Sequence, residues 1–337
     1  MKILLTGGAG YIGSHTCVAL LQAGFDVVIL DNFCNSQPEV MRRIESVAGK
    51  AAMLVRGDVR DTALVHALFS THQIAAVVHF AAFKAVGESV AQPLAYYANN
   101  LVGMVSLLQA MQAADCRPLV YSSSATVYGQ PQEVPITEAH PLGHTTPYGH
   151  TKLVGEEMLN ALAQAEPAWH FAVLRYFNPV GAHPSGQMGE DPAGLPNNLM
   201  PYVAQVAVGQ RPCLNVYGND YATIDGTGVR DYIHVMDLAA GHVAAVQKLL
   251  GQAGNFTVNL GTGRGYSVLQ VVKAFEAASS RPVPYKIQRR RAGDVASCYA
   301  DPALAKQLLD WQAHLTLDDM CADAWRWQSQ NPHGYAA

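Results

Sequence analysis

Tyr148 and Lys152 are the two residues whose types and spacing most clearly indicate chemistry. They open a predicted helix, where residues four apart lie one turn apart on the same face. A free tyrosine hydroxyl has a pKa near ~10 and is a poor base at neutral pH. A neighbouring lysine ammonium, together with any further positive charge at the site, stabilises the phenolate and lowers that pKa. Tyr148 is therefore a candidate general base or acid for interconverting a hydroxyl and a carbonyl group.

Three consecutive serines, Ser122, Ser123 and Ser124, end a predicted strand upstream of this helix. A serine hydroxyl at a strand end can hydrogen-bond a reacting oxygen and orient it towards Tyr148. The Tyr-x-x-x-Lys spacing alone also arises by chance on amphipathic helices. Its meaning therefore depends on what the rest of the chain can bind.

Glycines 7, 10 and 13 follow an apolar run at residues 3–5 and precede a predicted helix. In such a strand–turn–helix unit the first glycine permits the tight turn and the second lets backbone N–H groups approach a pyrophosphate. The third lets the helix pack closely on the strand with its positive end towards the anion. The alternative is an ordinary turn between a strand and a helix.

Asp31 ends the next predicted strand, residues 27–30, and lies 18 residues beyond Gly13. A carboxylate at this distance is placed to accept the hydroxyls of a ribose. It would repel a 2′-phosphate, and no Arg or Lys follows it within residues 32–36. The sequence therefore predicts NAD rather than NADP as the cofactor.

The composition is that of a compact enzyme: of 337 residues, 50% are hydrophobic and 14% charged. A net charge of −4 gives no support to nucleic-acid binding. No apolar run reaches the ~18 residues that span a bilayer. The six cysteines are scattered without a C-x-x-C pair, which predicts reduced thiols in a cytoplasmic protein. No metal site is expected.

Strand-like and helical segments alternate through the first half of the chain. This alternation predicts an α/β fold of the Rossmann type, with a doubly wound parallel sheet. Proline, glycine and asparagine accumulate after residue 179, and shorter elements follow, among them a strand at 214–217 and helices at 235–250 and 267–278. We therefore expect an NAD-binding domain at residues 1–178 and a smaller α/β substrate lobe at residues 179–337, with the cleft between them.

With these residues in place, the whole chain resembles the extended short-chain dehydrogenases/reductases, and among them the UDP-glucose (UDP-galactose) 4-epimerases. The most specific segments are residues 7–14, 31–36, 79–89, 122–129, 148–152, 175–181 and 225–235. The resemblance implies that Tyr148 is the catalytic base, supported by Lys152 and Ser124. It also implies an NAD pocket formed by Gly7, Gly10, Tyr11, Ile12, Gly13, Asp31, Asn32, Asn35, Ser36, Asp58, Val59, Phe80, Ala81, Lys84, Asn99, Ser122, Tyr148, Lys152 and Tyr176.

The same resemblance implies a UDP-sugar site in the second lobe. Its expected residues are Ser124, Asn178, Asn198, Leu199, Asn215, Tyr217, Arg230, Arg291, Asp294 and Cys298. Arginine has the fork-shaped donors that a diphosphate accepts, and Asp294 suits a ribose hydroxyl. The alternative for the run of arginines at 289–291 is a solvated surface turn.

The implied reaction is oxidation of the sugar at C4, rotation of the 4-keto sugar and return of hydride to its other face. Related nucleotide-sugar dehydratases need an acid beside the active-site hydroxyl residue, whereas here Ala125 follows Ser124. Other members of the superfamily, including decarboxylases and non-catalytic NAD-binding proteins, are the remaining alternatives. Those without activity typically lack the Tyr and Lys pair, and both residues are present here.

Two further expectations concern specificity and assembly. Cys298 matches a family position where a small residue accompanies activity on UDP-N-acetylglucosamine and UDP-N-acetylgalactosamine; the alternative is a merely small buried residue. Apolar residues cover more than one face of the helix near 95–114. That helix is either buried internally or, with the helix near 149–166, forms the contact of a homodimer.

Overall fold

A seven-stranded parallel sheet forms the first unit of the protein, in a computed structural model that describes residues 1–192, 194–251, 254–291 and 293–335. The strand order is β10-β6-β5-β4-β1-β2-β3. The strands are β1 (Lys2–Thr6), β2 (Asp26–Asp31), β3 (Met53–Arg56), β4 (Ile74–His79), β5 (Pro118–Ser124), β6 (His170–Tyr176) and β10 (Phe256–Leu260). The order reverses direction at β1, whose neighbours are β2 and β4, so the predicted Rossmann-type fold is confirmed.

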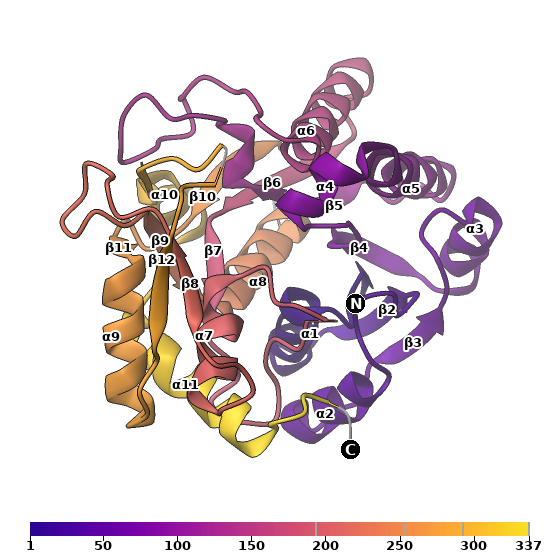
Figure 1. Cartoon of the computed structure of the whole chain (residues 1–337). Coiled ribbons are helices and arrows are strands. Elements are labelled where there is room, and N and C mark those ends of the chain that lie inside the picture. Colours follow the sequence, from indigo (N-terminus) through magenta and orange to yellow (C-terminus); the bar gives the residue numbers. More distant parts are fainter. Residues whose placement is uncertain (193, 252–253, 292, 336–337) are drawn as a thin grey trace.

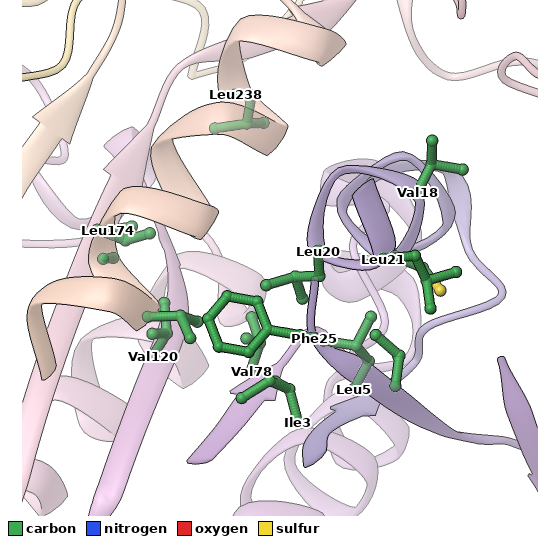
Figure 2. Packing of buried hydrophobic residues seen from close by; sticks show 14 of the residues in the cluster. Ile3, Leu5, Val18, Leu20, Leu21, Phe25, Val78, Val120, Leu174 and Leu238 are labelled. Atoms are coloured by element: carbon green, nitrogen blue, oxygen red, sulfur yellow. The ribbon is translucent and has the colours of Figure 1, made fainter. Parts of the chain in front are cut away.

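Alternation of side chains along the strands builds a separate core on each face of this sheet. Ile3 and Leu5 of β1 pack with α1 (Tyr11–Gln22), α2 (Glu39–Ala48) and α8 (Val235–Gly251). Figure 2 shows this face, with Phe25 and Leu20 against Val78 and Val120. Leu4, between them, points to the other face and packs with α3 (Thr62–Thr71), α5 (Pro93–Ala113) and α6 (Pro147–Ala165). Both faces are thus covered by helices, as a parallel sheet requires.

The second unit is smaller and lies beside the first (Figure 1). Its main sheet contains β7 (Asn178–Val180), β9 (Val229–His234), β11 (Gly265–Ser267) and β13 (Ser297–Cys298), with β9 pairing to the other three. β8 (Leu214–Tyr217) and β12 (Tyr285–Gln288) form a separate pair. Helices α7 (Leu199–Ala207), α9 (Val268–Ser279) and α11 (Leu317–Gln330) share its core, while α10 (Ala303–Leu309) contacts β10 and α8. The short helix α4 (Val86–Ala91) and the 3₁₀ turn η1 (Ala125–Val127) complete the elements.

The chain returns to the first unit after residue 178. Helix α8 packs against α1 and the strands β4, β5 and β6, and β10 pairs with β6 at the edge of the seven-stranded sheet. A single division at residue 178 therefore does not separate the two sheets, because α8 and β10 belong to the first. The division by ligand, with NAD bound mainly by residues 1–178 and UDP-sugar by residues 179–337, stays a prediction.

The other elements lie close to where the sequence places them. The strand at 214–217 matches β8. The helix expected at 235–250 ends one residue before α8, and the helix expected at 267–278 differs from α9 by one residue at each end. In the part of the chain that the structure describes, no helix is long and apolar enough to cross a membrane.

Candidate active site

One cavity of about 880 Å³ lies where the carboxyl ends of the parallel strands meet the second unit. All residues predicted to bind cofactor or substrate line it. From the first unit come Gly7, Gly10, Tyr11, Ile12, Gly13, Asp31, Asn32, Asn35, Ser36, Asp58, Val59, Phe80, Ala81, Lys84, Asn99, Ser122, Ser124, Tyr148, Lys152 and Tyr176. The second contributes Asn178, Asn198, Leu199, Asn215, Tyr217, Arg230, Arg291, Asp294 and Cys298. Their individual roles remain predictions, but the fold brings them to one place.

The glycine turn between β1 and α1 has the shape a pyrophosphate requires. Gly7 has a φ of +69°, and a Cβ there would lie 2.7 Å from the backbone nitrogen of Ala81. A Cβ at Gly13 would lie 2.5 Å from the Gly7 carbonyl oxygen. Gly10 caps α1 without any side-chain hydrogen bond, so the first N–H groups of the helix are not covered by a capping side chain. The residues present fit a dinucleotide phosphate at the positive end of α1.

Asp31 is held rigidly at the end of β2. Its carboxylate accepts hydrogen bonds from the backbone nitrogens of Ala9 (2.9 Å) and Phe33 (2.8 Å) and from the Ser36 hydroxyl (3.1 Å). Asp31 is only 8% exposed, so its orientation is fixed before any ribose binds.

A second carboxylate, Asp58, lies beside this site. Asp58 accepts from Asn32 Nδ2 (2.9 Å) and pairs with the Arg60 guanidinium at 2.7 Å, which lowers the pKa of Asp58 well below its usual range. Residues 32–36 contain no basic side chain, but Arg60 reaches this region from the turn between β3 and α3. Its charge is paired with Asp58, which leaves NAD as the cofactor that the pocket favours.

Ser124, Tyr148 and Lys152 meet at the carboxyl end of β5. Thr146 caps α6 by accepting from the Gly149 nitrogen at 3.2 Å, which fixes the first turn carrying Tyr148. Lys152 Nζ donates to the Ser122 carbonyl oxygen at 2.5 Å and lies 5.1 Å from the centre of the Tyr121 ring. Strand β5 and helix α6 are thus joined at the site, and all three candidate catalytic side chains face the same cavity.

Burial shifts the pKa values of Tyr148 and Lys152 in opposite directions. Desolvation raises the pKa of Tyr148 to about 12, although a hydrogen bond with Ser124 acts in the opposite direction. Desolvation also lowers the pKa of Lys152 to about 7, opposed by the charge of Glu156. Burial disfavours the charged form of each group, and sequence spacing does not reveal how far a group is removed from water. The expected lowering of the tyrosine pKa, which depends on positive charge from the bound cofactor as well as on Lys152, stays a prediction.

A buried ion pair lies behind the three candidate catalytic residues. Glu156 contacts Arg175 at 2.5 Å, with side chains 4% and 6% exposed. The Ser123 hydroxyl donates to the same carboxylate at 2.5 Å, and Arg175 also donates to Tyr128 at 3.1 Å. These bonds tie α6, β5 and β6 together one layer below the catalytic side chains.

The predicted diphosphate anchors also cluster. Arg230 on β9 lies in register with Cys298 on β13, and Arg230 and Arg291 both approach Asp294, at 3.9 Å and 3.0 Å. Arg291 lies over the Tyr217 ring at 4.8 Å. All three arginines of the run are exposed, and Arg291 also lines the cavity, so its role as a diphosphate anchor stays a prediction.

Comparison with known proteins decides the family. Over 335 residues the chain is 58% identical to the UDP-glucose 4-epimerase of Bacillus subtilis, with 99% of each chain covered. It is 56% identical over 341 residues to that of Homo sapiens, covering 99% of this chain and 98% of the human one. The chain belongs to the UDP-glucose 4-epimerase family.

Solved structures of UDP-glucose 4-epimerases agree with this assignment. The epimerase of Bifidobacterium longum in complex with NAD⁺ and UDP superimposes with a TM-score of 0.97 at 53% identity, covering 99% of this chain and 100% of that one. A broader family described as GDP-mannose 4,6 dehydratase matches residues 4–324. The predicted family, fold and enzyme class are confirmed, and the predicted cofactor agrees with the NAD⁺ of this neighbour.

Many residues of this epimerase-family chain line the cavity without having been predicted from the sequence, among them Thr126, Glu190 and Tyr335. The Thr126 hydroxyl is buried and has no hydrogen-bond partner among the described residues. Glu190 lies in a proline- and glycine-rich segment, and Tyr335 near the chain end, where spacing carries little information. Among the described residues, no group of three or more His, Cys, Asp or Glu side chains is arranged to hold a metal ion.

Proposed function

We propose that the protein interconverts UDP-glucose and UDP-galactose by reversible oxidation at C4 of the sugar. The observation that carries this proposal is the meeting, in one cavity, of the glycine cradle, the Ser124–Tyr148–Lys152 group and the Arg230–Arg291–Asp294 cluster. The first suits a dinucleotide, the second a hydroxyl–carbonyl exchange and the third a diphosphate. Family membership supports the same reaction.

When bound, NAD supplies the hydride acceptor and donor for the sugar C4. Tyr148 takes the proton of the 4-hydroxyl as the carbonyl forms and returns it as the hydroxyl is restored. Ser124 hydrogen-bonds the reacting oxygen and orients it towards Tyr148. Desolvation raises the pKa of Tyr148 to about 12, and positive charge near the phenolate acts in the opposite direction.

Inversion also requires a firmly held nucleotide and a loosely held sugar. Arg230 and Arg291, on either side of Asp294, provide the anchor for the diphosphate. The 4-keto sugar then turns about its linkage to the diphosphate and presents its other face. Ala125, at the start of η1, supplies no carboxylate to eliminate water, so dehydration is not favoured.

We propose that UDP-N-acetylglucosamine and UDP-N-acetylgalactosamine are substrates as well. Cys298 lines the cavity beside Arg230, and its small side chain leaves room that a phenol ring would fill. An acetamido group needs that volume.

We also propose a cytoplasmic homodimer. All six cysteines are free, as expected in a reducing compartment. On α5, Leu94, Val102 and Val105 are 81%, 52% and 40% exposed, while Met104 and Leu107 are buried. The helix therefore packs one apolar face in the core and directs another outwards. The first supports the expected internal burial, and the second supports the expected contact in a homodimer.

The deciding experiment is an assay of the purified protein with UDP-galactose and no added NAD. We expect UDP-glucose to form, because a reaction without net oxidation needs only the cofactor that copurifies with the protein. A fraction of reduced nicotinamide should absorb in the near ultraviolet and remain with the protein during gel filtration. Absence of conversion even after adding NAD would contradict the proposed function.

A further inference from the structure

Glu190 joins the two halves of the cavity through one carboxylate oxygen. Its Oε1 accepts from Lys84 Nζ at 3.1 Å and from Asn198 Nδ2 at 2.9 Å. Lys84 belongs to the first unit, in the segment after β4, whereas Asn198 caps α7 in the second. All three residues line the cavity. This one carboxylate therefore contacts a residue of the predicted NAD side and a residue of the predicted UDP-sugar side.

The backbone around Glu190 is fixed by the C-terminal segment. Trp327 Nε1 donates to the Glu190 carbonyl oxygen at 3.3 Å, and the Tyr335 hydroxyl donates to the Gly189 carbonyl oxygen at 3.2 Å. A Cβ at Gly189 would lie 2.3 Å from the Trp327 ring, so this loop packs directly on α11. The Glu190 carboxylate is thus presented from a rigid support.

Exposure separates the two partners of the ion pair. The Glu190 side chain is 10% exposed and that of Lys84 is 46% exposed. A mostly buried carboxylate is stable only with charged and hydrogen-bonded partners, and Lys84 and Asn198 provide them. A second bond between the units runs nearby, from the Tyr11 hydroxyl to the Gly181 carbonyl oxygen at 2.8 Å. Both bonds start from residues predicted to contact NAD.

We propose that Glu190 is a positioning residue whose ion pair with Lys84, here called the clasp, slows the release of NAD. Through its hydrogen bond with Asn198, Glu190 also couples the binding of UDP to the NAD site. The inference rests on the proposed function for the identity of the two ligands. Because one oxygen serves both lysine and asparagine, immobilising Asn198 by a bound nucleotide also immobilises the carboxylate that holds Lys84. By reciprocity, bound NAD strengthens the binding of UDP by the same factor.

The test measures the rate of NAD release from the holoenzyme into excess labelled NAD, with and without UDP. Glu190→Gln keeps the size of the side chain and removes its charge, so we expect release to become about fivefold faster, the effect of losing one partly exposed ion pair. In the wild-type protein, UDP slows release further; in E190Q that additional slowing is largely lost.

A double-mutant cycle distinguishes the clasp from general loosening of the loop. In a Lys84→Met background, E190Q should add no further increase, because the pair is already broken. Asp26→Asn, which breaks an exposed ion pair with Lys50 elsewhere on the first unit, is the matched control and should release NAD at the wild-type rate. Additive effects of E190Q and K84M, or equal slowing by UDP in E190Q and wild type, would overturn the proposal.

A second variant tests the same ion pair independently of how E190Q folds. If E190Q does not fold, Glu190→Asp retains the charge but shortens its reach, and we expect a smaller increase in the release rate; an unchanged rate overturns the clasp. Release is measured without sugar turnover. If the wild-type protein retains NAD but converts no UDP-galactose, the proposed function is contradicted. If it converts UDP-galactose but E190Q releases NAD at the wild-type rate, only the proposed role of Glu190 is contradicted.

Discussion

Tyr148 and Lys152 show how burial changes two functional groups in opposite directions. The pKa of the tyrosine is raised to about 12 and that of the lysine lowered to about 7, in each case because the charged form loses its hydration. Burial thus acts on the two groups in opposite directions, and any positive charge that a bound ligand brings to the site favours the phenolate form of Tyr148.

Replacing Tyr148 by Phe should remove the group that exchanges the proton at the 4-hydroxyl. We expect kcat for UDP-galactose to fall by about 10²-fold or more, since general acid–base groups typically contribute that much. Initial rates and bound NAD are measured together. Tyr97→Phe is the matched control, because its hydroxyl bonds His150 Nδ1 at 2.9 Å and does not line the cavity. Full activity in Y148F would rule out Tyr148 as the base.

Cys298→Tyr tests the proposed substrate range. A phenol ring beside Arg230 should exclude an acetamido group, so kcat/KM for UDP-N-acetylgalactosamine should fall by about tenfold or more. Turnover of UDP-galactose, measured in parallel, serves as the internal control and should be largely retained. Equal effects on both sugars would show that Cys298 does not determine specificity.

At the scale of elements, α5 combines an inward and an outward apolar face. Leu94, Val102 and Val105 are spaced by eight and three residues, which places them along one side of the helix. Their exposure is unusual for apolar side chains on a helix whose other face is fully packed. A second copy of the chain covering this face would bury them.

Val102→Asp should therefore weaken self-association. A carboxylate in the centre of an apolar contact must be desolvated without a partner, which is unfavourable. We expect the protein to sediment as a dimer and V102D as a monomer at the same concentration. Ile224→Asp, at an exposed apolar position in the second unit, is the control and should remain dimeric. A monomeric wild-type protein would contradict the dimer directly.

The sequence predicts elements better than it predicts their assembly. The apolar runs at residues 3–5 and 27–30 and the strand that ends in Ser122–Ser124 correspond to β1, β2 and β5, because each carries its own local pattern. Strand β10 was not predicted, and its pairing with β6 depends on a contact across more than 80 residues of chain. In the same way, the glycines, Asp31, Tyr148 and Lys152 have recognisable spacing, whereas Glu190 gains significance only when Lys84 and Asn198 are brought to it.

For the molecule as a whole, buried histidines should determine how stability depends on acid. Burial lowers the pKa of His79 to about 3 and those of His15 and His242 to about 4. The unfolded chain protonates these rings near pH 6.5, while the folded protein does not. Stability from the three neutral rings is therefore present above pH 6.5 and is lost as the pH falls towards 4.

We expect the urea midpoint to fall steeply between pH 6.5 and 4.5. Each buried histidine contributes up to about 1.4 kcal/mol per pH unit in this range. His242→Leu should reduce the slope, because one of the three titrating rings is gone, whereas His333→Gln, at an exposed position, should not. A slope equal in wild type and H242L would show that other groups govern acid unfolding.

Strand β10 and helix α8 also limit how the molecule can be divided. A fragment ending at residue 178 would leave the backbone edge of β6 without its neighbour and uncover the apolar side chains beneath α8. Such a fragment should aggregate on expression, and grafting residues 179–337 of a relative onto it would exchange part of the nucleotide-binding sheet itself. Nucleotide-sugar preference can therefore be altered residue by residue, but the two ligand-binding halves cannot be swapped as modules with one cut.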